Sequence, residues 1–328
     1  MSTTLACFPE ELLERILAEC VVAPPSPHPH APWHPSPATS LSPRTRTAPL
    51  LVSRAFYRIA VPLFYHTLVV HTHAQAATLL PTLTANPAFA ASVRRLVLLA
   101  PAPEVLALCT GLRLLDITLP PADADGAFAR ALAAQPLPRL RHLALRKAPG
   151  TYLSQPAPRA LLTALAAALP GAPLLESTTT SFPLSADPAL APLAAALTAA
   201  PALHTLRTPL PALWAPALCQ IADNPTLQRI CLGGEPSDRE GGARGCGVKG
   251  YSAGTGSPEQ PYILGTGLFF AEARKHARLS EVVRAGTGIL RGRAQTMGAS
   301  GASAPSASVS SRPHMTGAAC STIAEAAC

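Results

Sequence analysis

The sequence is poor in the side chains on which catalytic sites depend. Aspartate and glutamate together number 18 in 328 residues and are widely dispersed, so no pair of carboxylates stands out as a general acid and base. There is no Gly-x-Ser-x-Gly elbow, no His-Glu-x-x-His helix and no dinucleotide fingerprint. The glycine-rich stretch 242–250 lacks the Gly-Lys-Ser/Thr ending of a phosphate loop. We therefore expect no enzyme activity, no catalytic residue and no cofactor.

Concentrated positive charge is also missing. Lysine occurs only three times, and the more frequent arginines form no block, although the net charge is +8. Such a diffuse charge supports solubility and is not the basic footprint of a nucleic-acid-binding or membrane-binding protein. His28, His30 and His34 lie in a proline-rich stretch without cysteine or carboxylate partners nearby, which favours a flexible loop over a metal site. We expect no nucleic acid, membrane or metal as a partner.

Signals for export are absent as well. The first ten residues lack a basic start and a long apolar core, and the apolar tracts at 160–169 and 188–206 are short or broken by proline. The eight cysteines show no Cys-x-x-Cys spacing, and both asparagines precede proline, so neither forms a glycosylation sequon. These features favour a reducing compartment, cytoplasmic and/or nuclear. The thiols of Cys109, Cys219 and Cys231 lie in apolar segments and are expected to be buried and inert.

A strong helical signal follows the first few residues. Pro9 suits the first position of a helix, and the glutamates just after it suit the positive end of the helix dipole. Four apolar residues then recur at helical spacing, namely Leu12, Leu13, Ile16 and Leu17. Because a helix of about twelve residues is marginal on its own, this stripe is expected to dock on another element. An ordinary core helix would do the same.

A second segment accompanies this helix. Residues 50–60 read Leu-Leu-Val-Ser-Arg-Ala-Phe-Tyr-Arg-Ile-Ala, and Pro-Leu-Phe-Tyr-His-Thr-Leu follows at 62–68. Together with the first helix they resemble the F-box, the helical module by which substrate receptors attach to the adaptor of SCF ubiquitin ligases. Residues 8–13 match the family's opening Leu-Pro-x-Glu-Ile/Leu-Leu with Phe8 for Leu, and residues 52–56 match its Val-Cys-Arg/Lys-x-Trp with Phe56 for Trp. The continuation is similar to F-box-like proteins of mushroom-forming fungi.

The resemblance implies a helical module over residues 5–70, with a proline-rich flexible insert at 23–43 where the family usually has a short loop. It also implies a partner, the Skp-type adaptor of a cullin ubiquitin ligase. The residues that would form or support the adaptor-binding surface are Phe8, Pro9, Leu12, Leu13, Ile16, Leu17, Val52 and Phe56. The competing interpretation is a plain helical pair with no such partner.

From residue 93 a short leucine pattern recurs. Copies of Leu-x-x-Leu-x-Leu, or close to it, lie at 93–98, 112–117, 140–145, 203–208 and 227–232, with a weak copy at 174–179. The alanine-rich segments 123–134, 158–169, 188–199 and 211–222 lie between them and read as helices. This alternation favours an α/β fold, an irregular leucine-rich-repeat-like solenoid over 71–232 with parallel strands in chain order. A doubly wound sheet is the alternative, but its strands are usually near-continuous valine and isoleucine.

The flanking segments carry weaker signals. Residues 64–71 are expected to form a strand, and 74–85 a helix that Pro81 interrupts. A Gly/Ser-rich linker is expected at 233–263 and a disordered tail at 293–328. Between them, 264–292 contains an amphipathic helix at 268–283 that either caps the solenoid or binds a partner or an anionic surface. The residues sharing its apolar face would be Phe269, Ala273, His276, Leu279 and Val283.

The repeat geometry also predicts which residues point away from the core. The strand residues between the buried leucines include Arg95, His142, Arg207 and Arg229, which make one face mildly basic. They are either solvated strand residues or a site for an acidic or phosphorylated protein segment. The sequence thus predicts a non-catalytic substrate-recognition subunit of an SCF-type ubiquitin ligase, which presents a protein substrate on the solenoid. The alternative is a repeat-based interaction scaffold without a ubiquitin-ligase role.

Overall fold

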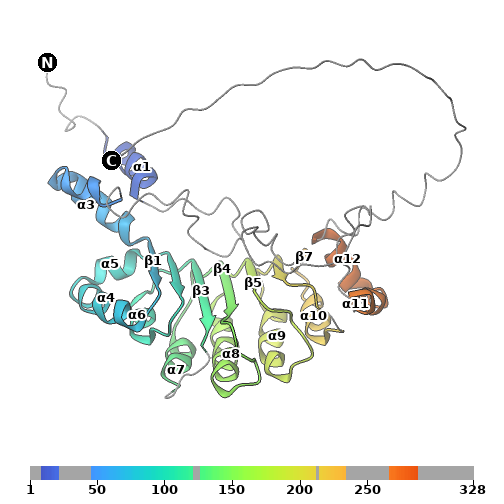
Figure 1. The fold of residues 1–328 in the computed structure, drawn as a ribbon. Helices are drawn as coiled ribbons and strands as arrows, with labels where there is room; N and C mark the ends of the chain where they lie inside the picture. The colour runs from blue at the N-terminus through green and yellow to red at the C-terminus, as the bar shows by residue number, and fades with distance from the viewer. Residues whose placement is uncertain (1–8, 22–45, 121–125, 212–213, 234–265, 287–328) are drawn as a thin grey trace, which may run out of the picture.

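The computed structural model describes residues 9–21, 46–120, 126–211, 214–233 and 266–286 (Figure 1). Several sequence predictions fall outside these ranges. They are Phe8, the histidines of the insert at 23–43, the insert itself, the glycine-rich stretch 242–250, all of the expected linker except Gly233, and the tail at 293–328.

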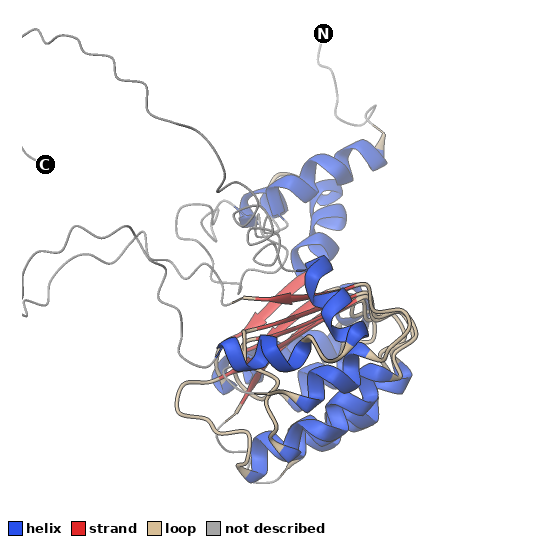
Figure 2. Cartoon of the chain, turned by 90° about the vertical axis from the view of Figure 1, so that its right-hand side faces the viewer, coloured by secondary structure: helices blue, strands red, loops and turns tan. Residues whose placement is uncertain are grey.

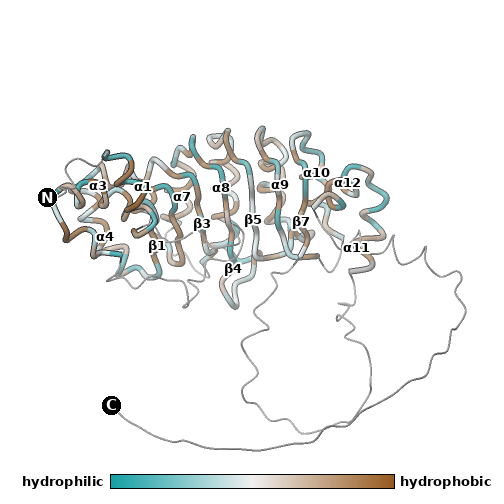
Figure 3. The backbone as a smooth tube through the Cα atoms, turned by 90° about the horizontal axis from the view of Figure 1, so that it is seen from above, coloured by the Kyte–Doolittle hydropathy of each residue, from teal (hydrophilic) through white to brown (hydrophobic). Residues whose placement is uncertain are grey.

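The centre of the fold is a seven-stranded sheet whose strands follow one another in chain order, from β1 to β7 (Figures 1 and 3). Every neighbouring pair is parallel. This confirms the predicted order and excludes the doubly wound alternative, in which the strand order reverses at a switch point. The strands are β1 (Thr67–Val70), β2 (Arg95–Leu98), β3 (Leu114–Leu119), β4 (His142–Lys147), β5 (Ser177–Thr180), β6 (Thr205–Thr208) and β7 (Arg229–Leu232).

Helices connect the strands and cover one side of the sheet (Figures 1 and 2). The abundant proline of this chain is used at their starts, because α5, α6, α8, α9 and α10 each carry proline at one of the first two positions, where no N–H partner is lost. The helices are α4 (His73–Ala85), α5 (Pro87–Ser92), α6 (Pro103–Leu108), α7 (Ala127–Ala134), α8 (Pro156–Ala168), α9 (Ala191–Thr198) and α10 (Pro216–Ala222).

The core lies between the sheet and this helical layer. The repeating leucines provide most of it, since Leu96, Leu115, Leu143 and Leu206 are each no more than 1% exposed. Burying a leucine of this kind contributes roughly 1.5–3 kcal/mol. In β5, the weak copy of the pattern, Thr178 and Thr180 occupy the equivalent buried positions, and the hydroxyl of Thr180 donates to the carbonyl of Phe182 (2.8 Å).

The secondary structure differs from the sequence prediction in three respects. Helix α4 continues through Pro81, because that residue is exposed and costs one backbone hydrogen bond while Ala76 and Leu83 anchor both halves in the core. Phe64 and Tyr65 belong to a helix, α3 (Arg54–Tyr65), and not to the strand, which starts at Thr67. Helices α5 and α6 were not predicted, because each is only six residues long.

Beyond β7 the predicted single helix is two helices, α11 (Thr266–Ala273) and α12 (Ala277–Gly286). The break between them places the ring of His276 on that of Trp214, 5.0 Å between centroids, and so leaves His276 off the buried face. Phe269, Ala273, Leu279 and Val283 are buried as expected.

Helix α12 lies against the last strand. Arg278 donates from Nη2 to the carbonyl of Leu227 (2.8 Å), just before β7. A side chain at position 286 would overlap the carbonyl of Ile230, so Gly286 permits the helix to approach the strand backbone closely. A helix in this position covers the edge strand of the sheet, whose backbone groups could otherwise pair with another chain.

One buried polar residue ties consecutive repeats together. The side-chain amide of Asn224, 1% exposed, donates to the carbonyls of Leu197 (2.9 Å) and Ala200 (2.8 Å) at the end of α9. Its oxygen accepts from the backbone N–H (2.9 Å) and the hydroxyl (2.8 Å) of Thr226. All its hydrogen-bonding capacity is therefore used inside the fold.

Replacing Asn224 by alanine is expected to lower the free energy of unfolding by about 2–4 kcal/mol, because two buried carbonyls lose their donor. Denaturant unfolding followed by circular dichroism measures the change. The matched control is Asp223→Ala at the exposed neighbouring position, with an expected change of about 0.5 kcal/mol or less. Equal effects of the two substitutions would contradict this role of Asn224.

Candidate interaction surfaces

The N-terminal helices form a small module of their own. Helix α1 (Glu10–Val21) packs on α3 and on the short 3-10 helix η2 (Ala48–Leu51). The module has a separate apolar cluster, formed by Leu13, Leu17, Val21, Ile59 and Ala60, with Leu50, Phe56, Leu63 and Phe64 half-buried around it.

Local capping explains where α3 begins. The hydroxyl of Ser53 accepts a hydrogen bond from the backbone N–H of Phe56 (3.2 Å), so the Val-Ser-Arg-Ala-Phe stretch is the start of this helix. On the other side, Arg46 donates from Nε to the carbonyl of Val21 at the end of α1 (2.9 Å) and lies over the ring of Phe64. Through these contacts Arg46, which lies just before η2, connects the end of α1 to α3.

The predicted apolar stripe of α1 divides into two sides. Leu13 and Leu17 are buried against α3, whereas Leu12 is 43% and Ile16 53% exposed. The expectation that the whole stripe docks on another element was therefore wrong for Leu12 and Ile16, because a helix packed on one partner buries only one side of a stripe this wide.

Further exposed apolar side chains come from the neighbouring segment. Val52 is 60% exposed and Leu51 86% exposed, and Pro9 is also exposed. We call Leu12, Ile16, Leu51 and Val52 the exposed apolar set. It lies on α1 and on the end of η2, two elements in contact with each other. Leu51 was missed at the sequence level, although the run Leu50-Leu51-Val52 is longer than one buried face requires.

A second surface is the side of the sheet opposite the helices. The register places its residues in two rows that cross all seven strands. The first row is Thr67, Arg95, Leu114, His142, Ser177, Thr205 and Arg229. The second row is Val69, Val97, Asp116, Ala144, Thr179, Arg207 and Cys231. All four predicted substrate-binding residues therefore lie on this strand face.

The acidic side chain of the strand face is already paired. Asp116, 4% exposed, accepts from Nε (2.8 Å) and Nη2 (2.7 Å) of Arg146 on the next strand in a bidentate arrangement. Such a partly buried pair binds its two members to each other and largely cancels their charges. Arg146 was not among the predicted site residues.

The predicted site residues differ in what they contact. Arg229 donates from Nε to the hydroxyl of Thr205 (3.0 Å), and Nδ1 of His142 lies 2.8 Å from the hydroxyl of Ser177. Burial of the ring, outweighing the nearby carboxylate of Glu176, lowers the pKa of His142, with Arg141 and Arg95 acting in the same direction as burial. His142 is therefore a neutral hydrogen-bonding group at neutral pH and not a cationic one.

Arg95 and Arg207 are the two predicted site residues whose side chains each contain a nitrogen without such a partner. Within the residues that the structure describes, the Nε of each is buried and has no hydrogen-bond acceptor. Burial lowers the pKa of Arg95 while the carboxylate of Asp116 opposes that shift. Burial also lowers the pKa of Arg207, with Cys231 opposing and Arg229 reinforcing the shift. Both guanidinium groups remain charged at neutral pH.

Two further arginines, Arg94 and Arg113, lie directly before β2 and β3. Neither was a predicted site residue. Burial of the ring, together with the charges of Arg94, Arg95 and Arg113, lowers the pKa of His66. Arg94 donates from Nη1 to the carbonyls of Ala91 (3.0 Å) and Gly111 (3.1 Å), so its position is structural. The signal in the sequence is a charged residue directly before each of several strands.

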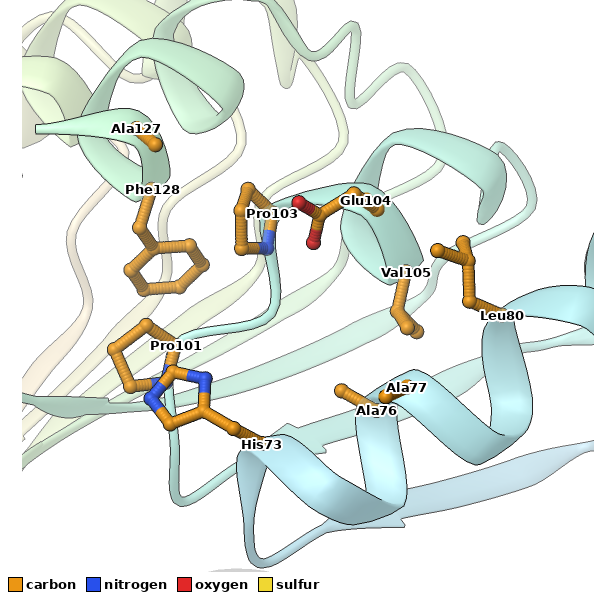
Figure 4. Close-up of a pocket in the computed structure, with 10 residues that line it drawn as sticks. All are labelled: His73, Ala76, Ala77, Leu80, Pro101, Pro103, Glu104, Val105, Ala127 and Phe128. Carbon is orange, nitrogen blue, oxygen red and sulfur yellow. The ribbon is translucent and has the colours of Figure 1, made fainter. Parts of the chain in front are cut away.

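One groove lies on the helical side, between α4, α6 and α7 (Figure 4). Its volume is about 340 Å³, and its walls are mainly alanine, proline and other apolar side chains. The titratable side chains on its walls are His73 and Glu104, which Figure 4 shows beside Pro101 and Pro103 respectively. This lining does not present the convergent polar groups that mark a small-molecule site.

The cysteines in the described part of the chain range from buried to exposed. Burial raises the pKa of Cys109 to about 12 and, helped by Asp223, that of Cys219 to about 11, which keeps both thiols protonated. Cys219 and Cys231 are half-buried, against the expectation that they are fully buried.

Within the described ranges no group of three or more histidine, cysteine or acidic side chains is arranged to hold a metal ion. Among the helices that the structure describes, none combines the length and apolarity needed to cross a bilayer.

No protein-family model matches this chain, and no curated protein matches it.

The division of α1 into two sides has a direct consequence for stability. Leu13→Ala is expected to lower the free energy of unfolding of the module by about 2–4 kcal/mol because it opens a cavity. Ile16→Ala is expected to change it by less than about 1 kcal/mol, since half of that side chain is in water. Thermal unfolding of the full chain, followed by hydrogen exchange of α1 and α3, measures both. Equal costs would show that Ile16 is buried after all.

The lowered pKa of His66 predicts a loss of stability in acid. The folded state favours the neutral ring, whereas the unfolded chain binds a proton at its ordinary pKa of about 6.5. The stabilisation is therefore complete above about pH 6.5 and is lost as pH falls toward the folded-state pKa. Melting temperatures measured between about pH 7.5 and 5.5 should fall less in His66→Gln than in the parent chain. Parallel curves for the two proteins would contradict the prediction.

Proposed function

We propose that this protein is a non-catalytic substrate receptor of an SCF-type ubiquitin ligase. In this proposal α1, η2 and α3 are an F-box-like module that binds a Skp-type adaptor. The seven strands and their helices are an irregular leucine-rich-repeat-like solenoid that presents a protein substrate. The ubiquitin-transfer chemistry would belong to other subunits, and the contribution of this chain would be proximity.

The observation that carries the proposal is the exposed apolar set. Leu12, Ile16, Leu51 and Val52 are large side chains held in water by a module whose own core already buries Leu13 and Leu17. Exposed apolar side chains gathered on neighbouring elements are typical of a protein–protein interface. Leu12, Ile16 and Val52 belong to the segments whose sequence resembles the F-box, which is why a Skp-type adaptor is the proposed partner.

The solenoid supports the second half of the proposal. Among the elements that the structure describes, the helices between the strands lie on one side of the sheet and leave the other face without a helical cover, and repeat proteins use such extended faces for binding. The two halves are joined at His66, whose carbonyl accepts the backbone N–H groups of Arg94 (3.0 Å) and Arg95 (2.9 Å) directly after α3. A partner on the module and a substrate on the sheet would therefore be held in one arrangement.

The adaptor prediction concerns the exposed members of α1. The double variant Leu12→Ala, Ile16→Ala is expected to weaken binding of a purified Skp-type adaptor about tenfold or more, since central apolar contacts dominate interfaces. The fold should be retained, because both side chains are about half in water. Calorimetric titration of the full chain with the adaptor measures binding, and circular dichroism measures folding.

The matched control is Leu99→Ala, Leu174→Ala, which removes two side chains of similar exposure, 39% and 45%, from the solenoid. It should bind the adaptor like the parent chain. If the parent does not bind the adaptor, the chain is an interaction scaffold without this ligase role. If the folded double variant binds the adaptor unchanged, the exposed apolar set is not the adaptor-binding surface.

A further inference from the structure

The strand face carries an imbalance of charge. On this face the strands hold four basic side chains, Arg95, Arg146, Arg207 and Arg229, and one acidic side chain, Asp116, which gives +3; Lys147 alternates with Arg146 and belongs to the other side of the sheet. Arg146 occupies both oxygens of Asp116. The remaining charge lies in two places along the rows, at Arg95 on β2 and at Arg207 with Arg229 on β6 and β7.

These two places, which we call the β2 anchor and the β6–β7 anchor, each contain an incomplete hydrogen-bonding group. The Nε atoms of Arg95 and Arg207 are buried, and within the described part of the chain neither has an acceptor. A buried donor without a partner costs free energy, and a charged donor costs more. Because Arg95 and Arg207 are only partly buried, an oxyanion brought to each anchor can reach the guanidinium group, and a rotation of the side chain would let Nε donate to it in the charge-assisted geometry for which arginine is best suited.

The β6–β7 anchor contains two positive charges on neighbouring strands. Arg207 faces Cys231 directly across the strand pair, and Arg229 lies two residues before Cys231 on the same face. The two guanidinium groups are close enough to act on each other, and no carboxylate lies in the strands around them. Two neighbouring cations without an anion favour binding of one from outside.

The separation of the anchors gives the length of the ligand. Arg95 on β2 and Arg229 on β7 belong to one row and are five strand steps apart. At about 4.8 Å a step this is about 24 Å. An extended chain covers about 3.3–3.6 Å per residue, so about seven residues span it. Between the anchors this row contains the exposed side chain of His142, whose Nδ1 lies 2.8 Å from the hydroxyl of the buried Ser177, and carries no further charged side chain.

The composition of the face favours a peptide over a single-stranded nucleic acid. Neither row contains a phenylalanine, tyrosine or tryptophan on which a base could stack. A net charge of +3 in two separate places also differs from the continuous basic groove that follows a phosphate backbone. Neutral side chains between two charged ends suit an extended peptide that carries acidic side chains at two separate positions.

We propose that the strand face binds an extended protein segment with two anionic side chains about seven residues apart, one at each anchor. This identification of the substrate class rests on the proposed receptor function. The anions are carboxylates or phosphates, which share the chemistry that arginine recognises. The segment crosses the strands, and its anionic groups accept hydrogen bonds from Arg95 at one end and from Arg207 and Arg229 at the other.

The test uses the full chain and fluorescent peptides of about twelve residues built from alanine, serine and glycine. One peptide carries phosphoserine at two positions about seven residues apart, a second carries glutamate there, and a third carries glutamine. A fourth has its two phosphoserines about three residues apart. Fluorescence anisotropy should show that the widely spaced anionic peptides bind at least about tenfold more tightly than the other two. The phosphoserine and glutamate arms identify the source of the charge.

The variants divide the site into its anchors. Arg207→Gln with Arg229→Gln should weaken the widely spaced anionic peptides about tenfold or more, and Arg95→Gln should do so from the other end. The matched control is Arg159→Gln with Arg284→Gln, exposed positions on α8 and α12 that change the net charge equally. It should leave peptide binding within about twofold of the parent. Circular dichroism establishes that each variant is folded.

A second measurement does not depend on affinity. Cys231 lies beside both arginines of the β6–β7 anchor. Its alkylation rate, measured by mass spectrometry, should fall when the peptide is bound, whereas the rate at exposed Cys20 should not change. Protection at both cysteines, or at neither, would contradict the placement.

Several outcomes would overturn the inference. Equal weakening by the anchor variants and the control pair would show that only overall charge matters. Tighter binding of an oligothymidylate of about twelve nucleotides, lost in the anchor variants, would assign the face to nucleic acid. Absence of peptide binding in a chain that still binds the adaptor would reject this substrate class and leave the receptor proposal standing. A chain that binds the peptide but not the adaptor would reject the receptor proposal and leave the peptide-binding site standing.

Discussion

The continuous ladder between parallel strands is the constraint on which the rest of the structure depends. Each strand has only four to six residues and could not persist alone, but its backbone groups bond to the strands on either side. The leucines of each strand then face the same side, so a common helical layer can cover them. Where the pattern weakens, at β5, buried threonines still keep the ladder in register.

This ladder also arranges the polar residues into a surface. Because parallel register brings equivalent positions of successive repeats side by side, residues that are 134 positions apart in the chain, Arg95 and Arg229, lie in one row. The same register aligns Asp116 with Ala144 and places Arg146 diagonally across from it, so the one acidic side chain in the strands that the structure describes is bound to Arg146 and does not compete with a ligand. The charge of the face is thus a property of the register and not of local sequence.

The ends of the ladder are closed differently. At the first strand the α3 helix enters the sheet through His66, so the N-terminal module continues the sheet's own hydrogen-bonding pattern. At the last strand α12 covers the edge, held by Arg278 and by the close approach of Gly286. The C-terminal helices bury Phe269, Leu279, Val282 and Val283 and expose one large apolar side chain, Leu268, whereas the N-terminal module exposes Leu12, Ile16, Leu51 and Val52. This asymmetry is why the proposed adaptor site lies at the N-terminal end.

The sequence alone determined the alternation of strands and helices, the parallel order and the two faces of each strand, since these follow from a short repeated pattern with a period of two. Tertiary structure decided what the pattern could not. Which half of the α1 stripe is buried depends on the position of α3, so the prediction was wrong for Leu12 and Ile16. The helix at 268–283 is divided because Trp214 and the edge of β7 are packed beside it. The unpaired state of Arg95 and Arg207, and the loss of charge at His142, depend on neighbours from other strands, which local periodicity does not encode.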